Sequence, residues 1–166
     1  MMELTLEDAI KKAIELEEHG LNFYIECEKK TNNAQGKDMF SYLAKEEVHH
    51  KERLKKYLED EVANPSSNTR VWVPDPEKIK EEVFKPIRQG LDEKSDEIDA
   101  LNVGVEAETQ SIRYYKKLEE QCNPGACQNL FVELVNEEEK HLAILTKEVE
   151  FVTETGEYYD FKTVTM

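Results

Sequence analysis

The octapeptide KEEVHHKE at residues 45–52 contains two overlapping Glu-x-x-His pairs, a spacing that can bring a carboxylate and an imidazole to one metal ion. One pair is Glu46 with His49, and the other is Glu47 with His50. Because successive residues of an α-helix point about 100° apart, the two pairs cannot both face the interior of a protein. The chemistry of this stretch therefore depends on which pair lies inward.

An internal repeat favours the second pair. When the second half of the chain is shifted by 91 positions, Glu47 and His50 match Glu138 and His141, whereas the position that matches His49 holds a lysine. The pair Glu46 and His49 is therefore not reproduced in the second half of the chain. The matched positions follow one another in steps of three or four, which makes each set one stripe of a helix. They are Ile10, Ile14, Glu17, Leu21 and Tyr24 with Leu101, Val105, Glu108, Ile112 and Tyr115, and Phe40, Leu43, Glu47, His50 and Leu54 with Phe131, Leu134, Glu138, His141 and Leu145.

Four glutamates and two histidines thus lie in stripes that are otherwise apolar. Burying unpaired carboxylates is costly, and four that face one another would also repel, so something must compensate their charge. No lysine or arginine occupies the stripes. Two divalent cations would balance four carboxylates, with the two imidazoles completing the ligand set. The predicted metal ligands are Glu17, Glu47, His50, Glu108, Glu138 and His141.

Four long helices must position these residues. Helical periodicity predicts them at about residues 5–30, 38–61, 95–121 and 126–152, with Thr5 as the first N-cap. A crossover at about residues 63–95, rich in proline, contains a short predicted helix near residues 77–85. Two antiparallel hairpins joined by one long crossover indicate an all-α, ferritin-like four-helix bundle. We expect one domain over residues 1–152, followed by a tail, residues 153–166, that the pattern does not place.

Composition narrows the classes of partner. A net charge of −15 argues against binding to nucleic acid or to an anionic membrane and is compatible with cations. No apolar run is long enough to cross a bilayer, and the first ten residues do not have the pattern of a secretion signal. Three cysteines in a chain of 166 residues favour a reducing compartment, so we expect a cytoplasmic protein.

The motifs resemble those of the rubrerythrin-like branch of the ferritin-like superfamily, over about residues 5–152. ELEEHGLNFY and LAKEEVHH resemble the first two helix motifs of that family, and VEAETQSIRYY and LVNEEEKH repeat them. The resemblance implies that Glu17 and Glu108 are terminal ligands of a di-iron site, that Glu47 and Glu138 bridge the ions, and that each histidine binds one ion. It also implies that Tyr24 and Tyr115 donate hydrogen bonds across the bundle to ligand carboxylates.

The sequence departs from full-length rubrerythrins in two ways. It has no pair of Cys-x-x-Cys motifs for a rubredoxin-type iron site, so electrons would come from an external donor. Cys122 and Cys127 flank the turn between the last two helices, where separate structural thiols are favoured over a redox disulfide. Ser111 stands where rubrerythrins carry an additional carboxylate, which affects the expected peroxidase mechanism but not the six ligands.

The sequence therefore predicts a non-haem di-iron oxidoreductase that reduces hydrogen peroxide or oxygen, with manganese as the alternative metal. We expect a homodimer that takes electrons from a donor such as a rubredoxin. A second hypothesis is a ferroxidase or iron-handling protein without peroxide turnover. A third hypothesis is a non-catalytic bundle, which either binds metal or is an interaction module without metal. In the interaction module, Trp72 and the pair Tyr158–Tyr159 would anchor a partner. In the other cases, these residues would dock the crossover or form the dimer interface.

Overall fold

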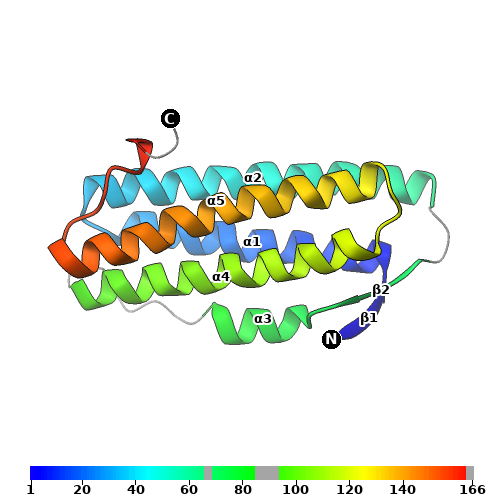
Figure 1. Ribbon diagram of the computed structural model, residues 1–166, viewed down its shortest axis with the longest axis horizontal. Helices are drawn as coiled ribbons and strands as arrows, with labels where there is room; N and C mark the ends of the chain where they lie inside the picture. The colour runs from blue at the N-terminus through cyan, green and yellow to red at the C-terminus, as the bar shows by residue number, and fades with distance from the viewer. Residues whose placement is uncertain (66–68, 85–93, 164–166) are drawn as a thin grey trace.

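The computed structural model describes residues 1–65, 69–84 and 94–163 of the chain. Four long helices run alongside one another, and a short helix lies beside the bundle in the connection between its halves (Figure 1). The long helices are α1 (Leu6–Lys30), α2 (Ala34–Ala63), α4 (Lys94–Gln121) and α5 (Ala126–Thr155), and the short one is α3 (Pro76–Val83).

The long helices form two hairpins. Short turns join α1 to α2 and α4 to α5, and the two helices of each hairpin pack against each other along their length. The prediction of an all-α bundle of two antiparallel hairpins, linked through a short helix, is confirmed. Helix α2 begins four residues before the predicted start and α5 ends three residues beyond the predicted end. The predicted crossover residues 85–93 lie outside the described residues.

Local signals explain where the helices begin. The predicted cap is present, because the Thr5 hydroxyl accepts a hydrogen bond of 3.1 Å from the backbone N–H of Asp8, an interaction that stabilises a helix by roughly 1 kcal/mol. Asn33 caps α2 in the same way. Asp75 caps α3, where Pro76 occupies the first turn and has no N–H to leave unbonded. The starts of α1 and α2, the two helices that carry the site residues of the first half, are thus each stabilised by an N-cap.

The structure adds a small sheet that the sequence did not predict. Strand β1 (Met2–Thr5) pairs in antiparallel register with β2 (Arg70–Val73), with Glu3 opposite Trp72. The outer edge of β2 is closed by the Gln121 side chain, which accepts from the Trp72 N–H at 2.7 Å and donates to its carbonyl at 2.8 Å. The Trp72 side chain is 53% exposed, so it does not dock the crossover onto the bundle. Four-residue strands are too short for a clear periodic pattern.

A disulfide closes the turn between α4 and α5. Cys122 and Cys127 are bonded, with their Cα atoms 5.7 Å apart, so the prediction of separate thiols was wrong. Spacing alone did not reveal that the turn brings the two Cβ atoms together. Cys27 is a free, buried thiol, as predicted for a core residue.

The buried core consists of two apolar clusters. One gathers the start of α1, the end of α4 and, from the crossover, β2 and α3, around Leu54 and Phe131. The other gathers the end of α1 and the start of α2 around Phe40 and Leu145. The six predicted ligands lie between these clusters on their helices, so polar groups interrupt the apolar core at one level of the bundle.

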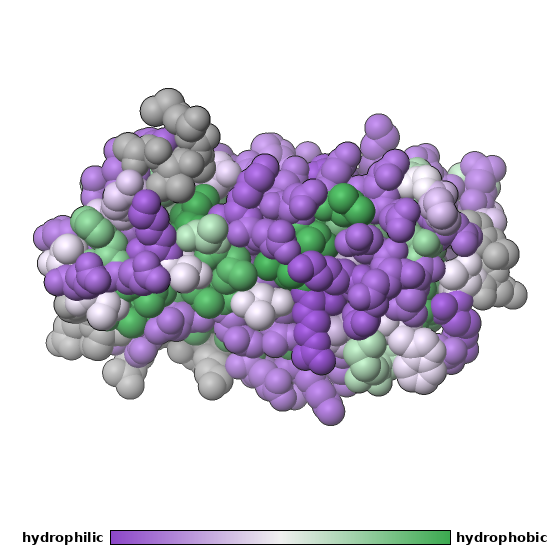
Figure 2. All heavy atoms as spheres, in the orientation of Figure 1, coloured by the Kyte–Doolittle hydropathy of each residue, from purple (hydrophilic) through white to green (hydrophobic). Residues whose placement is uncertain are grey.

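The outer surface fits a helical bundle in water on the face that is in view. Figure 2 shows that hydrophilic side chains predominate on this face. Among the described residues, no helix combines the length and apolar character needed to cross a membrane.

The C-terminal tail packs back onto the bundle. Tyr158 is buried and donates a hydrogen bond to the carboxylate of Glu97 on α4. Its ring lies directly over Gly36, where an added Cβ would come within 3.0 Å of the ring. Phe161, in a 3-10 helix (Phe161–Thr163), packs against Tyr42, whose ring in turn lies edge-on to His141. The tail therefore covers one side of the bundle near the predicted site.

Glu148 links the tail to a testable pH dependence. Its side chain is buried on α5, and one carboxylate oxygen accepts a 2.8 Å hydrogen bond from the backbone N–H of Tyr159. Burial raises the pKa of Glu148 to about 7, above the value of about 4.3 for an unfolded chain. The protonated form is therefore favoured by folding, and the stability it contributes is complete below about pH 4.3 and lost as the pH rises through 7.

We expect Glu148→Gln to remove this component of the pH dependence. In metal-free protein, the free energy of unfolding of the wild type relative to the variant should fall by roughly 1–3 kcal/mol between pH 5 and pH 8. Urea denaturation at both pH values measures it, with the exposed neighbour Glu150→Gln as the control. Equal pH dependence in the wild type and in both variants would contradict the assignment.

Candidate metal centre

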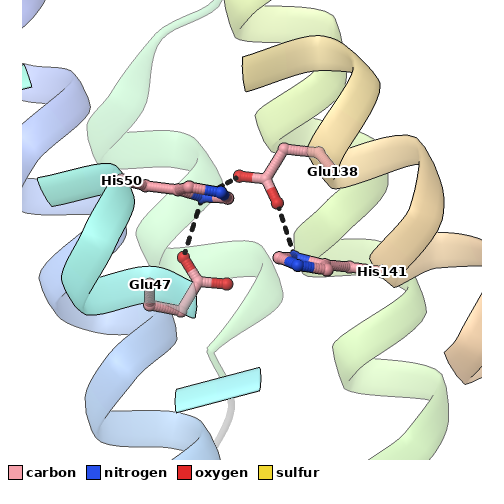
Figure 3. Close-up of side chains that lie close together, drawn as sticks. All are labelled: Glu47, His50, Glu138 and His141. Carbon is pink, nitrogen blue, oxygen red and sulfur yellow. Dashed lines mark hydrogen bonds and ion pairs between the residues drawn. The ribbon is translucent and has the colours of Figure 1, made fainter. Parts of the chain in front are cut away.

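The two Glu-x-x-His pairs of the repeat meet in the interior of the bundle. Glu47 and His50 project from α2, Glu138 and His141 project from α5, and their polar ends point toward one another (Figure 3). One donor atom from each of the four residues lies within 4.8 Å of the others. All four side chains are buried. This is the spacing of atoms that can share metal ions.

The first and third bundle helices each add one carboxylate. Oε2 of Glu17 lies 3.5 Å from Nδ1 of His50, and Oε1 of Glu108 lies 3.8 Å from Nδ1 of His141. Both glutamates are 2% exposed. The structure therefore brings all six residues predicted from the repeat into one buried cluster, with one glutamate from each of α1 and α4 and one Glu-x-x-His pair from each of α2 and α5.

Glu138 lies between the two imidazoles. Its Oε1 is 3.2 Å from Nδ1 of His50, and its Oε2 is 2.9 Å from Nδ1 of His141. Oε2 of Glu47 lies farther from the same Nδ1 of His50, at 3.9 Å. The two rings stack with their centroids 5.4 Å apart. Both Nδ1 atoms thus face the carboxylates, and a carboxylate placed between them has the position of a bridge.

Several atoms of the cluster lack the hydrogen bonds that buried polar groups normally make. Oε2 of Glu17, Oε1 of Glu138 and both ring nitrogens of His50 have no hydrogen-bond partner of good geometry. Leaving such groups unsatisfied costs free energy that a folded protein usually avoids. A cation within reach of these atoms would satisfy them, so the cluster fits a metal site on its own chemistry.

The electrostatics of the cluster lead to the same conclusion. Burial, together with the charges of Glu17 and Glu138, raises the pKa of Glu47 well above its usual range. Burial and the charge of Glu138 do the same to the pKa of Glu108. Burial would lower the pKa of His50, but the carboxylates around it raise it instead. The cluster therefore resists holding four negative charges unless positive charge is supplied.

Two tyrosines hold the terminal carboxylates from across the bundle. The Tyr24 hydroxyl, on α1, donates to Oε1 of Glu108 on α4, and the Tyr115 hydroxyl, on α4, donates to Oε1 of Glu17 on α1. Both tyrosines are 1% exposed. These are the cross-bundle hydrogen bonds that the resemblance implied. In Glu17 they leave Oε2 facing His50, whereas in Glu108 the oxygen that accepts from Tyr24 is also the one that lies 3.8 Å from His141.

The sequence reasoning missed two carboxylates at the outer side of the histidines. Oε2 of Glu137 lies 3.0 Å from Nε2 of His50, and Oε2 of Glu46 lies 4.0 Å from Nε2 of His141. The same 91-residue repeat relates Glu46 to Glu137, and this match is a signal for both carboxylates even though the histidine at position 49 does not recur at position 140. His49 itself is 64% exposed at its side chain, as predicted for the outer face.

A narrow cavity reaches the cluster between α1 and α4. Its volume of about 10 Å³ is room for about one water-sized molecule. Ser111 lines this cavity, so the position where rubrerythrins carry a further carboxylate does border the cluster here. The other lining residues are Leu16, Gly20, Tyr24, Glu47, Phe84, Ala107 and Glu108.

Comparison with known proteins agrees with this geometry. The family model described as Rubrerythrin matches residues 8–149, which contain all six clustered residues. Among solved structures, a hypothetical protein from Pyrococcus furiosus is similar, with a TM-score of 0.74, 25% sequence identity and coverage of 94% of both chains. No curated protein gave a significant match. Since the family model covers most of its length, this chain belongs to the rubrerythrin family.

Proposed function

We propose that the chain is a non-haem di-iron oxidoreductase that reduces hydrogen peroxide or oxygen with electrons from an external donor protein such as a rubredoxin. The observation that carries the proposal is the buried cluster of four carboxylates and two imidazoles with unsatisfied polar atoms directed into it. Carboxylate and imidazole ligands suit iron or manganese in the divalent state. Family membership favours a redox role for such a site.

The four glutamates would have different roles as ligands of the ions. Glu138 would bridge, since its two oxygens face different histidines, and Glu47 would be a further ligand near His50. Glu17 and Glu108 would each bind one ion, and the hydrogen bonds from Tyr115 and Tyr24 would hold these two carboxylates in place. Two ferrous ions held in this way would supply the two electrons that convert hydrogen peroxide, with two protons, into two molecules of water.

The surroundings favour a small substrate. The cavity beside Glu47 and Glu108 has room for about one water-sized molecule, which matches hydrogen peroxide or oxygen better than an organic substrate. Burial of the cluster excludes bulk water, so the carboxylates and tyrosines would stay in fixed positions while the charge on the metal pair changes.

Anaerobic reconstitution with ferrous iron, followed by hydrogen peroxide, tests this proposal. We expect two iron ions per chain, rapid formation of the diferric state seen by its near-ultraviolet absorbance, and repeated turnover when a reductant is supplied. Oxidation of one equivalent without turnover would contradict a peroxidase and favour an iron-handling role. Turnover with manganese but not with iron would contradict the choice of metal.

A further inference from the structure

The outer nitrogens of the two histidines lie in unequal surroundings, although the repeat makes their inner surroundings similar. Nδ1 of each ring faces the carboxylate cluster, which leaves Nε2 to face outward. A carboxylate beside the outer nitrogen of a metal-binding histidine fixes the tautomer and the ring orientation and makes the inner nitrogen a stronger ligand. Each hairpin has a carboxylate on the outer side of the other hairpin's histidine: Glu137 lies 3.0 Å from Nε2 of His50, and Glu46 lies 4.0 Å from Nε2 of His141.

Glu137 is held in place, whereas its counterpart is not held in the same way. The Arg53 guanidinium donates to Oε2 of Glu137 at 2.6 Å, the same oxygen that lies 3.0 Å from His50. Arg53 also donates to Glu133 at 2.6 Å, so two carboxylates of α5 fix its orientation. Because Arg53 follows His50 by three residues on α2, both side chains reach Glu137 from one helix face.

The second half of the repeat lacks this anchor. The position that matches Arg53 is Ile144, which has no polar group to bond a carboxylate. Glu46 lies 4.0 Å from Nε2 of His141, beyond a normal hydrogen bond, and its other oxygen lies 3.5 Å from the exposed His49. The side chains of Glu46 and Glu137 are similarly exposed, at 27% and 34%. The difference between them is therefore anchoring and distance, not access to water.

We propose that Glu137, fixed by Arg53, is a positioning residue for His50 and makes the two metal positions unequal, so that the ion at His50 binds more tightly than the ion at His141. The inference rests on the proposed dimetal site. In the structure Nε2 of His50 is close to Glu137 without the alignment of a hydrogen bond. A ring held by an ion at Nδ1 needs only to turn its Nε2–H toward this carboxylate. Within the described part of the chain, the carboxylate recorded at Nε2 of His141 is that of Glu46, at the longer distance of 4.0 Å.

Anaerobic titration of the metal-free protein with Co²⁺, followed by calorimetry and by cobalt absorbance, tests the proposal. The wild type should bind two ions in two resolved steps. Glu137→Gln should weaken the tighter step by about 10- to 100-fold and change the other by less than about 3-fold. Glu46→Gln, the matched change in the other half of the repeat, should change either step by less than about 3-fold.

Two further readouts separate positioning from a general structural effect. Arg53→Gln should weaken the same step as Glu137→Gln, and the double variant should be no weaker than the worse single variant, because both changes remove one interaction. In the Co²⁺ form, the exchangeable ring proton of His50 should give a shifted proton resonance that moves in Glu137→Gln and not in Glu46→Gln. Thermal melting of the metal-free variants reports whether each of them folds.

The possible failures are distinguishable. Binding of fewer than two Co²⁺ ions by the wild type would overturn the proposed dimetal site itself. Binding of two ions with equal effects from Glu137→Gln and Glu46→Gln, or with a larger effect from Glu46→Gln, would overturn only the inferred inequality.

Discussion

Replacing Glu138 by alanine is expected to lower metal binding from two ions per chain to one or none. Its two oxygens lie 3.2 Å from Nδ1 of His50 and 2.9 Å from Nδ1 of His141, so it is placed to contact both ions. Loss of a bridging ligand removes a bond from each ion, whereas loss of a terminal ligand removes one bond from one ion. Metal analysis after anaerobic loading and gel filtration measures the stoichiometry.

Two companion variants make this result specific. Glu138→Gln keeps the volume of the side chain and should also lose metal, which excludes a cavity as the cause. Glu139→Ala removes the adjacent exposed glutamate, which pairs with Lys116 at 2.8 Å, and should retain both ions. Retention of two ions by Glu138→Ala would contradict the bridging role.

Replacing Tyr115 by phenylalanine is expected to weaken one metal position by about 10- to 100-fold, and Tyr24→Phe to weaken the other. Each hydroxyl holds one oxygen of a glutamate on the neighbouring hairpin, Tyr115 for Glu17 and Tyr24 for Glu108. Removing the hydroxyl leaves a buried carboxylate oxygen without its donor and frees the side chain to rotate. Calorimetric titration with Co²⁺ gives the affinity of each step.

A matched control is available in Tyr114→Phe. Tyr114 is also fully buried, but its hydroxyl donates to the backbone carbonyl of Ala9 at 2.9 Å, away from the cluster. Its loss should destabilise the fold by about 1 kcal/mol and leave both affinities unchanged. Equal losses of metal affinity in Tyr114→Phe and Tyr115→Phe would show that the effect comes from the fold and not from the carboxylate.

The helices and the six clustered residues were predictable because they depend on periodicity. A stripe with steps of three and four marks which side of a helix faces inward, and the repeat selects Glu47 and His50 over Glu46 and His49. The cross-bundle hydrogen bonds of Tyr24 and Tyr115 came from the family resemblance and not from the stripe. The periodic pattern shows which side chains of one helix face inward. It does not show which residues of another helix they contact, because that depends on how the two helices pack.

The features that the sequence did not predict depend on contacts between distant segments. Strand β2 forms because β1 offers a backbone edge and because Val71 and Val73 are buried against the bundle. The C-terminal tail packs onto the bundle because the Tyr158 ring lies over Gly36 and its hydroxyl donates to Glu97, two residues that are distant from it along the chain. The role proposed for Glu137 depends on its hydrogen bond from Arg53, a residue of the other hairpin. In each of these contacts the two residues lie on different elements, so the periodicity within one helix does not reveal the contact.

A crystal structure of the protein loaded anaerobically with ferrous iron, with anomalous diffraction recorded at the iron edge, tests the central claim most directly. We expect two iron peaks inside the bundle, one bonded to Nδ1 of His50 and the other to Nδ1 of His141, with Glu138 contacting both. A structure without iron between α2 and α5, or with iron bound at His49 on the outer face, would contradict the account.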